Sequence, residues 1–116
     1  MREIIFDTET TGLDPKEDRV IEIGAIELVN RFPTGKTFHH YIHPSDRPIH
    51  PDAQAVHGIS LEALAGKPAF SGIAGDFVAF IEGAKLIAHN ANFDIAFINA
   101  EFARLGGIHR NTFINS

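Results

Sequence analysis

Three apolar runs in the first part of the chain follow the pattern of β-strands. Residues 3–8 form a short apolar run that ends in polar residues, which predicts a buried strand. Residues 19–30 alternate with apolar side chains on both faces, which predicts a central strand. Pro33 and Gly35 indicate a turn, and residues 36–44 predict a strand that returns antiparallel. These runs predict an antiparallel meander of three strands.

The second part of the chain changes to helical spacing. Apolar side chains recur every three or four residues in 68–83 and again in 92–107, where the pattern ends at two glycines, so both segments predict helices. Residues 84–90 predict a short further strand between them. The long segment 44–60 has three prolines and no sustained period, so we expect a loop with room for one helical turn.

This order of elements predicts an α/β fold: a mixed sheet, made of the meander plus a parallel strand, with flanking helices. No strand or helix of any length is predicted after Leu105. We therefore expect residues 1–116 to form a single domain that is incomplete at its C-terminal end.

Composition narrows the class of protein. The chain has 116 residues, of which 44% are hydrophobic and 22% charged, and this composition is typical of a soluble globular domain. Without cysteine it has no disulfides and no thiolate metal site. Acidic residues come too early for a signal peptide and no apolar run has membrane-spanning length, so we expect a cytoplasmic protein. The net charge of −5 argues against nucleic-acid binding unless cations lie between protein carboxylates and phosphates.

Two carboxylates close the first predicted strand. Residues two apart on a strand share a face, so Asp7 and Glu9 are expected side by side at the carboxyl end of that strand, the edge where open α/β sheets bind ligands. Their charges repel unless one is protonated or a divalent cation lies between them. The alternative is a strand end that is simply solvated.

A third carboxylate, Asp94, begins the helix that follows the last predicted strand. If that strand lies beside the first, Asp94 approaches Asp7 and Glu9. Three carboxylates without cysteine suit Mg²⁺ or Mn²⁺, and such clusters perform two-metal phosphodiester chemistry. The alternative is that Asp94 only complements the dipole of its helix.

The histidines divide into a strand group and a loop residue. His39, His40 and His43 lie on or next to a predicted strand, and we interpret them as surface residues rather than metal ligands. His57 lies in the long loop, where it either contacts a phosphate or packs the loop.

Further candidates flank Asp94. His89 and Asn90 lie where the strand ends, in positions to donate hydrogen bonds to a ligating carboxylate. Phe93 is a candidate for stacking on a base. The remaining phenylalanines at helical spacing are expected in the core: Phe70, Phe77, Phe80, Phe97 and Phe102.

Four stretches carry a family resemblance. FDTETTG, VIEIGA, AVHGI and AHNANFD resemble, in this order, the DEDD-type 3′–5′ exonucleases of the ribonuclease H-like fold. VNRFPTGKTFHHYIHP and EFARLGGIHRNTF resemble in particular the proofreading subunits of bacterial replicative DNA polymerases. The resemblance runs from Arg2 to Phe113, and the four stretches together are specific although no single one is.

The resemblance implies a reaction and roles. It implies removal of nucleotides from DNA 3′ ends as 5′-monophosphates with two Mg²⁺ or Mn²⁺ ions. Asp7, Glu9 and Asp94 would be the catalytic metal ligands, and Asp7 would bridge both ions. The residues that the resemblance places around the 3′-terminal nucleotide are Thr10, Thr11, Gly12, His57 and His89. The implied partners are a single-stranded DNA 3′ end and, for the full-length protein, a polymerase catalytic subunit and a small accessory subunit.

One part of the family pattern is missing. A general-base histidine followed by a fourth carboxylate is expected after Asp94, but only His109 follows it and no acidic residue follows Glu101. His109 lies in the wrong segment for that role. We therefore expect this chain to be part of a longer protein and to hydrolyse DNA poorly by itself.

Two alternatives remain open on the sequence. The first is a stand-alone DEDD exonuclease that acts on RNA ends or short oligonucleotides, since discrimination between sugars depends on few contacts. The second is a non-catalytic, nuclease-like fragment that docks on another protein.

Overall fold

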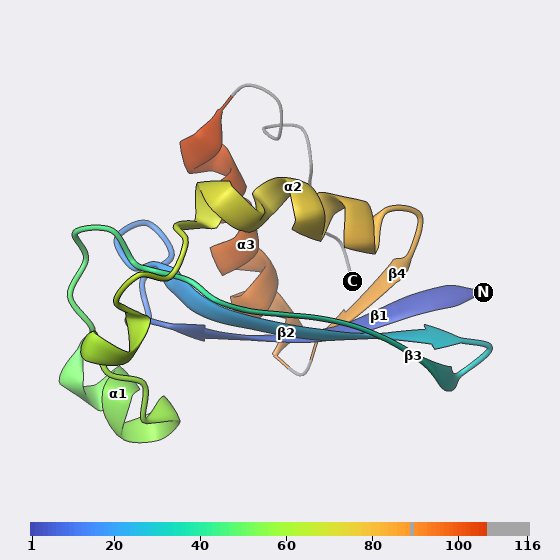
Figure 1. The fold of residues 1–116 in the computed structure, drawn as a ribbon, viewed down its shortest axis with the longest axis horizontal. Helices are drawn as coiled ribbons and strands as arrows, with labels where there is room; N and C mark the ends of the chain where they lie inside the picture. Colours follow the sequence, from blue (N-terminus) through green and yellow to red (C-terminus); the bar gives the residue numbers. More distant parts are fainter. Residues whose placement is uncertain (89, 107–116) are drawn as a thin grey trace.

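A computed structural model describes residues 1–88 and 90–106, so His89 and His109 lie outside the described residues. The sheet has the order β3-β2-β1-β4 (Figure 1). Its strands are β1 (Arg2–Thr10), β2 (Val20–Val29), β3 (Phe32–Tyr41) and β4 (Lys85–Ala88). Pairing is antiparallel from β1 to β3, whereas β4 runs parallel to β1 with Ile87 opposite Ile5. The predicted mixed sheet is confirmed.

Two helices cover one face of the sheet. They are α2 (Phe70–Ile81) and α3 (Ala91–Leu105), and Figure 1 shows both on the same side of the strands. Phe6 of β1, Phe77 of α2 and Phe97 of α3 are at most 1% exposed and meet in the core between these layers. Within the described ranges, none of the helices is long and apolar enough to cross a membrane.

The hairpin between β2 and β3 turns earlier than the sequence predicts. Asn30 and Arg31 take positive φ angles of 52° and 73°, which suit the right-handed twist of a tight hairpin. The predicted turn residues Pro33 and Gly35 instead lie inside β3, where the pairing with β2 is irregular. The turn prediction is wrong because β3 lies at the edge of the sheet, where a proline without an N–H group is tolerated.

The long segment before α2 contains more structure than expected. Helix α1 (Pro51–His57) begins with Pro51, and the His50 ring caps it by accepting a hydrogen bond from the Asp52 N–H at 3.1 Å. It ends at Gly58, whose φ of 71° is left-handed. A 3₁₀ turn, η1 (Glu62–Leu64), follows. Helix α1 lies beyond the end of the sheet toward which β1 runs (Figure 1).

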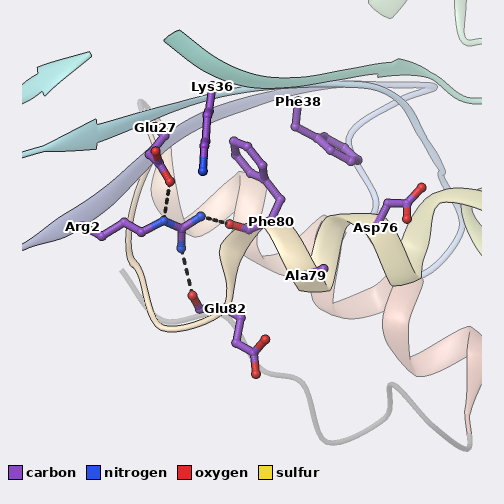
Figure 2. Close-up of a pocket in the computed structure, with 8 residues that line it drawn as sticks. All are labelled: Arg2, Glu27, Lys36, Phe38, Asp76, Ala79, Phe80 and Glu82. Atoms are coloured by element: carbon purple, nitrogen blue, oxygen red, sulfur yellow. Dashed lines mark hydrogen bonds and ion pairs between the residues drawn. The ribbon is translucent and has the colours of Figure 1, made fainter. Parts of the chain in front are cut away.

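Arg2 ties the opposite end of the sheet to α2. Its guanidinium pairs with the Glu27 carboxylate and donates to the carbonyl oxygens of Phe80 and, at 2.8 Å, Glu82 (Figure 2). This contact fixes the start of β1 against α2. Asp7 and Glu9 lie near the other end of the same strand.

Candidate active site

Asp7 and Glu9 share the face of β1 that points away from α2 and α3. Asp7 is exposed and Glu9 half-buried, whereas Thr8 between them is 5% exposed on the helix side. Glu22 lies directly opposite Glu9 on β2. The three carboxylates line a hollow of about 110 Å³, together with Thr8 and Gly24. The predicted side-by-side arrangement is confirmed, and Glu22 adds an acidic neighbour that sequence reasoning missed.

Asp94 reaches the same strand from the helix side. Parallel pairing of β4 with β1 places the first turn of α3 beside β1, and Thr8 Oγ1 donates a hydrogen bond of 2.6 Å to Asp94 Oδ1. The side chain is 1% exposed, and within the described part of the chain its second oxygen, Oδ2, has no hydrogen-bond partner. A buried carboxylate oxygen without a donor is costly, and this one is available to a cation.

The carboxylates influence one another electrostatically. Burial raises the pKa of Glu9 above its usual value, the charge of Asp7 raises it further, and His57 opposes the shift. Burial likewise raises the pKa of Asp94, where the hydrogen bond from Thr8 opposes the shift and the charge of Asp7 adds to it. Asp7 therefore acts on both neighbours, and a divalent cation among them would relieve the repulsion and favour their ionised forms.

The chemistry of the candidate ligands suits a hard cation. All candidate ligands are carboxylate oxygens, which Mg²⁺ and Mn²⁺ prefer. Among residues 1–88 and 90–106, however, no three Asp, Glu or His side chains stand close enough together to hold one ion as they lie. The carboxylates are too far apart for one ion because Asp94 is hydrogen-bonded to Thr8 on the helix side of β1. Asp7 and Glu9 point to the opposite face of the sheet.

The turn after Glu9 is held by its own hydroxyl groups. Thr10 Oγ1 donates to the Gly12 carbonyl at 2.6 Å, and Thr11 Oγ1 donates to Asp18 Oδ1 at 2.9 Å. A Cβ at Gly12 would lie 2.4 Å from Asp18 Oδ2, so any larger residue would have to displace the Asp18 carboxylate that binds Thr11. The side chains of Thr10 and Thr11, at most 6% exposed, shape the turn and do not face outward toward a substrate.

His57 packs against this turn and has a defined tautomer. Its Nδ1 accepts a hydrogen bond of 3.0 Å from the Ile59 N–H, so the proton of the neutral ring resides on Nε2. Nε2 then donates to the Thr10 carbonyl at 3.0 Å. His57 therefore has the loop-packing role that the sequence left open.

Three further candidate residues, Phe93, Asn90 and His39, make contacts within the protein. The Phe93 ring is half-buried with its centroid 4.7 Å from that of Phe97, so it packs in the helix layer. Asn90 contributes its carbonyl oxygen, which accepts from the Asp94 N–H at 2.9 Å. His39 is exposed on β3, in agreement with its interpretation as a surface residue, and its Nε2 lies 2.6 Å from Glu22 Oε2.

Sequence reasoning also missed the contacts that hold the loop between β1 and β2. Glu101 of α3, which is 1% exposed, binds the Arg19 guanidinium through both carboxylate oxygens and accepts from the Val20 N–H. Asp18 binds Arg47 Nε at 2.9 Å. No local signal could reveal these pairs, because their members are up to 82 residues apart.

A larger hollow lies on the outer side of the same turn. It measures about 500 Å³ and lies between the turn and α1. The exposed side chains of Leu13 and Val56 contribute apolar walls, and Arg47 and His50 lie on its polar side. Its volume and apolar lining are typical of a small-molecule or nucleotide site.

Comparison with known proteins decides the family. A family model described as "Exonuclease" matches residues 4–116. The chain belongs to this exonuclease family. Exonucleases of this family generally depend on divalent metal ions, which agrees with the carboxylate chemistry of Asp7, Glu9 and Asp94.

Similar proteins are longer than this exonuclease chain. It is 57% identical over 107 residues to DNA polymerase III subunit epsilon of Rickettsia felis, a match that covers 90% of this chain and 46% of that protein. It is 48% identical over 109 residues to the protein of the same name in Escherichia coli K12, a match that covers 90% of this chain and 44% of that protein. The chain thus spans about half the length of the curated relatives it matches.

Solved structures confirm the ribonuclease H-like fold. Exonuclease I from Methylocaldum szegediense aligns with a TM-score of 0.80 at 21% identity, covering 90% of this chain and 24% of that one. Exonuclease X in complex with 5′ overhanging duplex DNA aligns with a TM-score of 0.65 at 33% identity. This match covers 81% of this chain and 52% of that one.

Proposed function

We propose that this exonuclease chain is part of the proofreading 3′–5′ exonuclease subunit of a bacterial replicative DNA polymerase. The observation that carries the proposal is the placement of Asp7 and Glu9 on one face of β1, with buried Asp94 bound to Thr8 between them on the other face. Similarity to the epsilon subunits of DNA polymerase III supports the proofreading role. The substrate is a single-stranded DNA 3′ end.

Asp7, Glu9 and Asp94 would hold two Mg²⁺ or Mn²⁺ ions. When bound, these ions would lower the pKa of the attacking water and stabilise the leaving 3′-oxygen. Asp94 is the ligand whose orientation this chain controls most directly, because Thr8 Oγ1 occupies one of its oxygens and leaves the other without a described partner. The unpaired oxygen supports Asp94 as a ligand.

The turn Thr10–Thr11–Gly12 would hold the 3′-terminal nucleotide. Because both hydroxyl groups bind within the turn, we expect them to act by fixing its shape. The apolar walls at Leu13 and Val56 would contact the base. His57 keeps the turn in place through the Thr10 carbonyl, and Phe93 and His89 remain predicted contacts of the nucleotide.

The proposal extends to assembly and to the chain's own activity. The full-length protein would bind a polymerase catalytic subunit, in keeping with the name of its relatives, and a small accessory subunit, as the family resemblance implies. Residues 1–116 would form one exonuclease domain that lacks the general-base histidine and the fourth carboxylate. We therefore expect weak metal binding and poor hydrolysis by this chain.

The test uses a single-stranded DNA oligonucleotide with a label near its 3′ end, in Mn²⁺, with this chain and with a longer version that includes the third motif. We expect slow release of 5′-monophosphates by the short chain, faster release by the long one, and none by Asp7→Ala in either. RNA of the same sequence should be cut more slowly. A long version that cleaves nothing would refute the enzymatic role, and full-rate cleavage by the short chain would show that the third motif is not required.

A further inference from the structure

A further hollow lies between the end of β3 and the segment that follows α1. It measures about 410 Å³. The residues that line it are Tyr41, His57, Gly58, Ile59, Ala63 and Lys67. His57 connects this hollow to the turn after Glu9, because its Nε2 donates to the Thr10 carbonyl. His57 is therefore shared by the turn and the hollow.

Tyr41 faces the same side of the sheet as Glu9. Glu9, Glu22 and Tyr41 are opposite one another on β1, β2 and β3, and directly paired residues project to one face. Two strand spacings separate Glu9 from Tyr41, which amounts to about 10 Å between their Cα atoms. One or two nucleotides span such a distance.

The Tyr41 ring is held in place before any ligand binds. It contacts the His39 ring edge-on, with centroids 5.0 Å apart, and His39 Nε2 lies 2.6 Å from Glu22 Oε2. Tyr41 is nevertheless 38% exposed. An ordered and accessible aromatic ring is the usual platform on which a base of a single strand stacks.

Lys67 adds a positive charge to the lining of the hollow. Arg2, Arg19 and Arg47 pair with carboxylates, whereas within the described residues Lys67 lies in no ion pair of 4 Å or less. It lines the hollow beside His57. Lys36, by contrast, lines a separate hollow at the far end of the sheet (Figure 2). An acidic chain that takes a DNA strand needs cations along its path, and Lys67 is placed to meet a phosphate there.

We propose that the hollow between Tyr41 and Lys67 binds single-stranded DNA upstream of its 3′-terminal nucleotide. A base stacks on Tyr41 and a backbone phosphate pairs with the Lys67 ammonium. This subsite rests on the proposed exonuclease function. It gives the chain a preference for oligonucleotides over mononucleotides, because a mononucleotide at the carboxylates does not extend to Tyr41.

Intrinsic fluorescence tests the proposal directly, because Tyr41 is the only tyrosine and the chain has no tryptophan. The chain is titrated in Ca²⁺ with oligo(dT) and, separately, with thymidine 5′-monophosphate, with correction for absorbed light and a check that the oligonucleotide stays intact. We expect the oligonucleotide to quench Tyr41 emission and the mononucleotide to leave it unchanged. Equal quenching by both, or no quenching while a labelled oligonucleotide binds, overturns the subsite.

Variants test the phosphate contact. Lys67→Gln should weaken oligonucleotide binding severalfold and reduce the salt dependence, d log K/d log[salt], by about 0.7, the value for one contact with a single strand. Lys67→Arg should restore both. Lys85→Gln, at the exposed start of β4, is the matched control and should change neither. Unchanged affinity in Lys67→Gln refutes the subsite alone. The anisotropy of a labelled oligonucleotide reports binding to the wild-type chain, and no change in it refutes the proposed function as well.

Discussion

Thr8 Oγ1 donates a hydrogen bond of 2.6 Å to Asp94 Oδ1, which joins two residues 86 positions apart in the sequence. Through this contact, α3 meets β1 between the two carboxylates Asp7 and Glu9. The contact explains why a threonine lies between two acids on a strand: its side chain projects to the helix face while theirs project to the other.

Replacing Thr8 by Val should destabilise the fold by about 1–3 kcal/mol, because the buried Asp94 carboxylate loses the Thr8 hydroxyl donor while the strand keeps a β-branched residue. Urea unfolding at neutral pH measures the change. Thr37→Val, an exposed position on β3, is the matched control and should stay within about 0.5 kcal/mol of the wild type. Equal stability of both variants would mean that the bond adds nothing.

Asp94→Asn should stabilise the metal-free protein near neutral pH. Burial raises the pKa of Asp94 above its ordinary 3.8, so the folded state holds a proton that the unfolded chain has released, and wild-type stability falls as pH rises above about 4. The loss levels off once the folded carboxyl ionises, and each unit of the pKa shift corresponds to about 1.4 kcal/mol.

Thermal melts from pH 4 to 8 in EDTA should therefore show a flatter profile for Asp94→Asn than for the wild type. Added Mn²⁺ should raise the melting temperature of the wild type but not of the variant, because a ligand that binds the folded state stabilises it. Asp76→Asn, on the exposed face of α2, should behave as the wild type in both experiments. A variant that is less stable at pH 7 in EDTA would contradict the prediction.

Gly12→Ala should cost about 1–3 kcal/mol, because the new Cβ would lie 2.4 Å from Asp18 Oδ2 and displace that carboxylate from Thr11 and Arg47. The chain provides an opposite control in Gly75, inside α2, where a Cβ meets nothing within 4 Å. Gly75→Ala should raise stability by about 0.5–1 kcal/mol through helix propensity. Denaturant midpoints that move in the same direction for both variants would count against the proposed clash.

Glu101→Gln should destabilise the protein by about 3 kcal/mol, because it leaves the Arg19 guanidinium without the carboxylate that binds it. Since Arg19 follows the turn that carries Thr11 and Gly12, local opening of that loop should increase more than opening of the sheet. Amide hydrogen exchange measures both: residues 11–19 should lose protection, while Phe6 in β1 should lose it only by the global amount. Uniform loss across the chain would show that Glu101 acts only on global stability.

Much of the fold follows from local patterns in the sequence. Alternation predicts β2, helical spacing predicts α2 and α3, and the strand at Ile87 lies beside β1 as expected. These patterns are readable because each depends on neighbours within a few positions. The hairpin turn was misplaced because Pro33 is a turn signal in general, and only its place on an edge strand makes it compatible with β3.

The site could be predicted in part for the same reason. Asp7 and Glu9 share a face by the geometry of any strand, and the resemblance of the four stretches led to the exonuclease family that the comparisons confirm. Glu22 could not be assigned to the hollow, because its position opposite Glu9 depends on the register of β2 against β1. The roles of Thr10 and Thr11 as internal hydrogen-bond donors likewise depend on Asp18 and on the shape of the turn.

The sequence by itself therefore determined most strands and helices, the family, and Asp7, Glu9 and Asp94 as the candidate acids, because periodicity and short motifs are properties of adjacent positions. The tertiary structure decided which face each acid occupies, that Asp94 is turned onto Thr8, and that Glu101 holds Arg19 from 82 residues away. Such contacts form only after β4 pairs with β1 and carries α3 over the sheet. Long-range hydrogen bonds depend on that packing, and no local pattern along the chain encodes them.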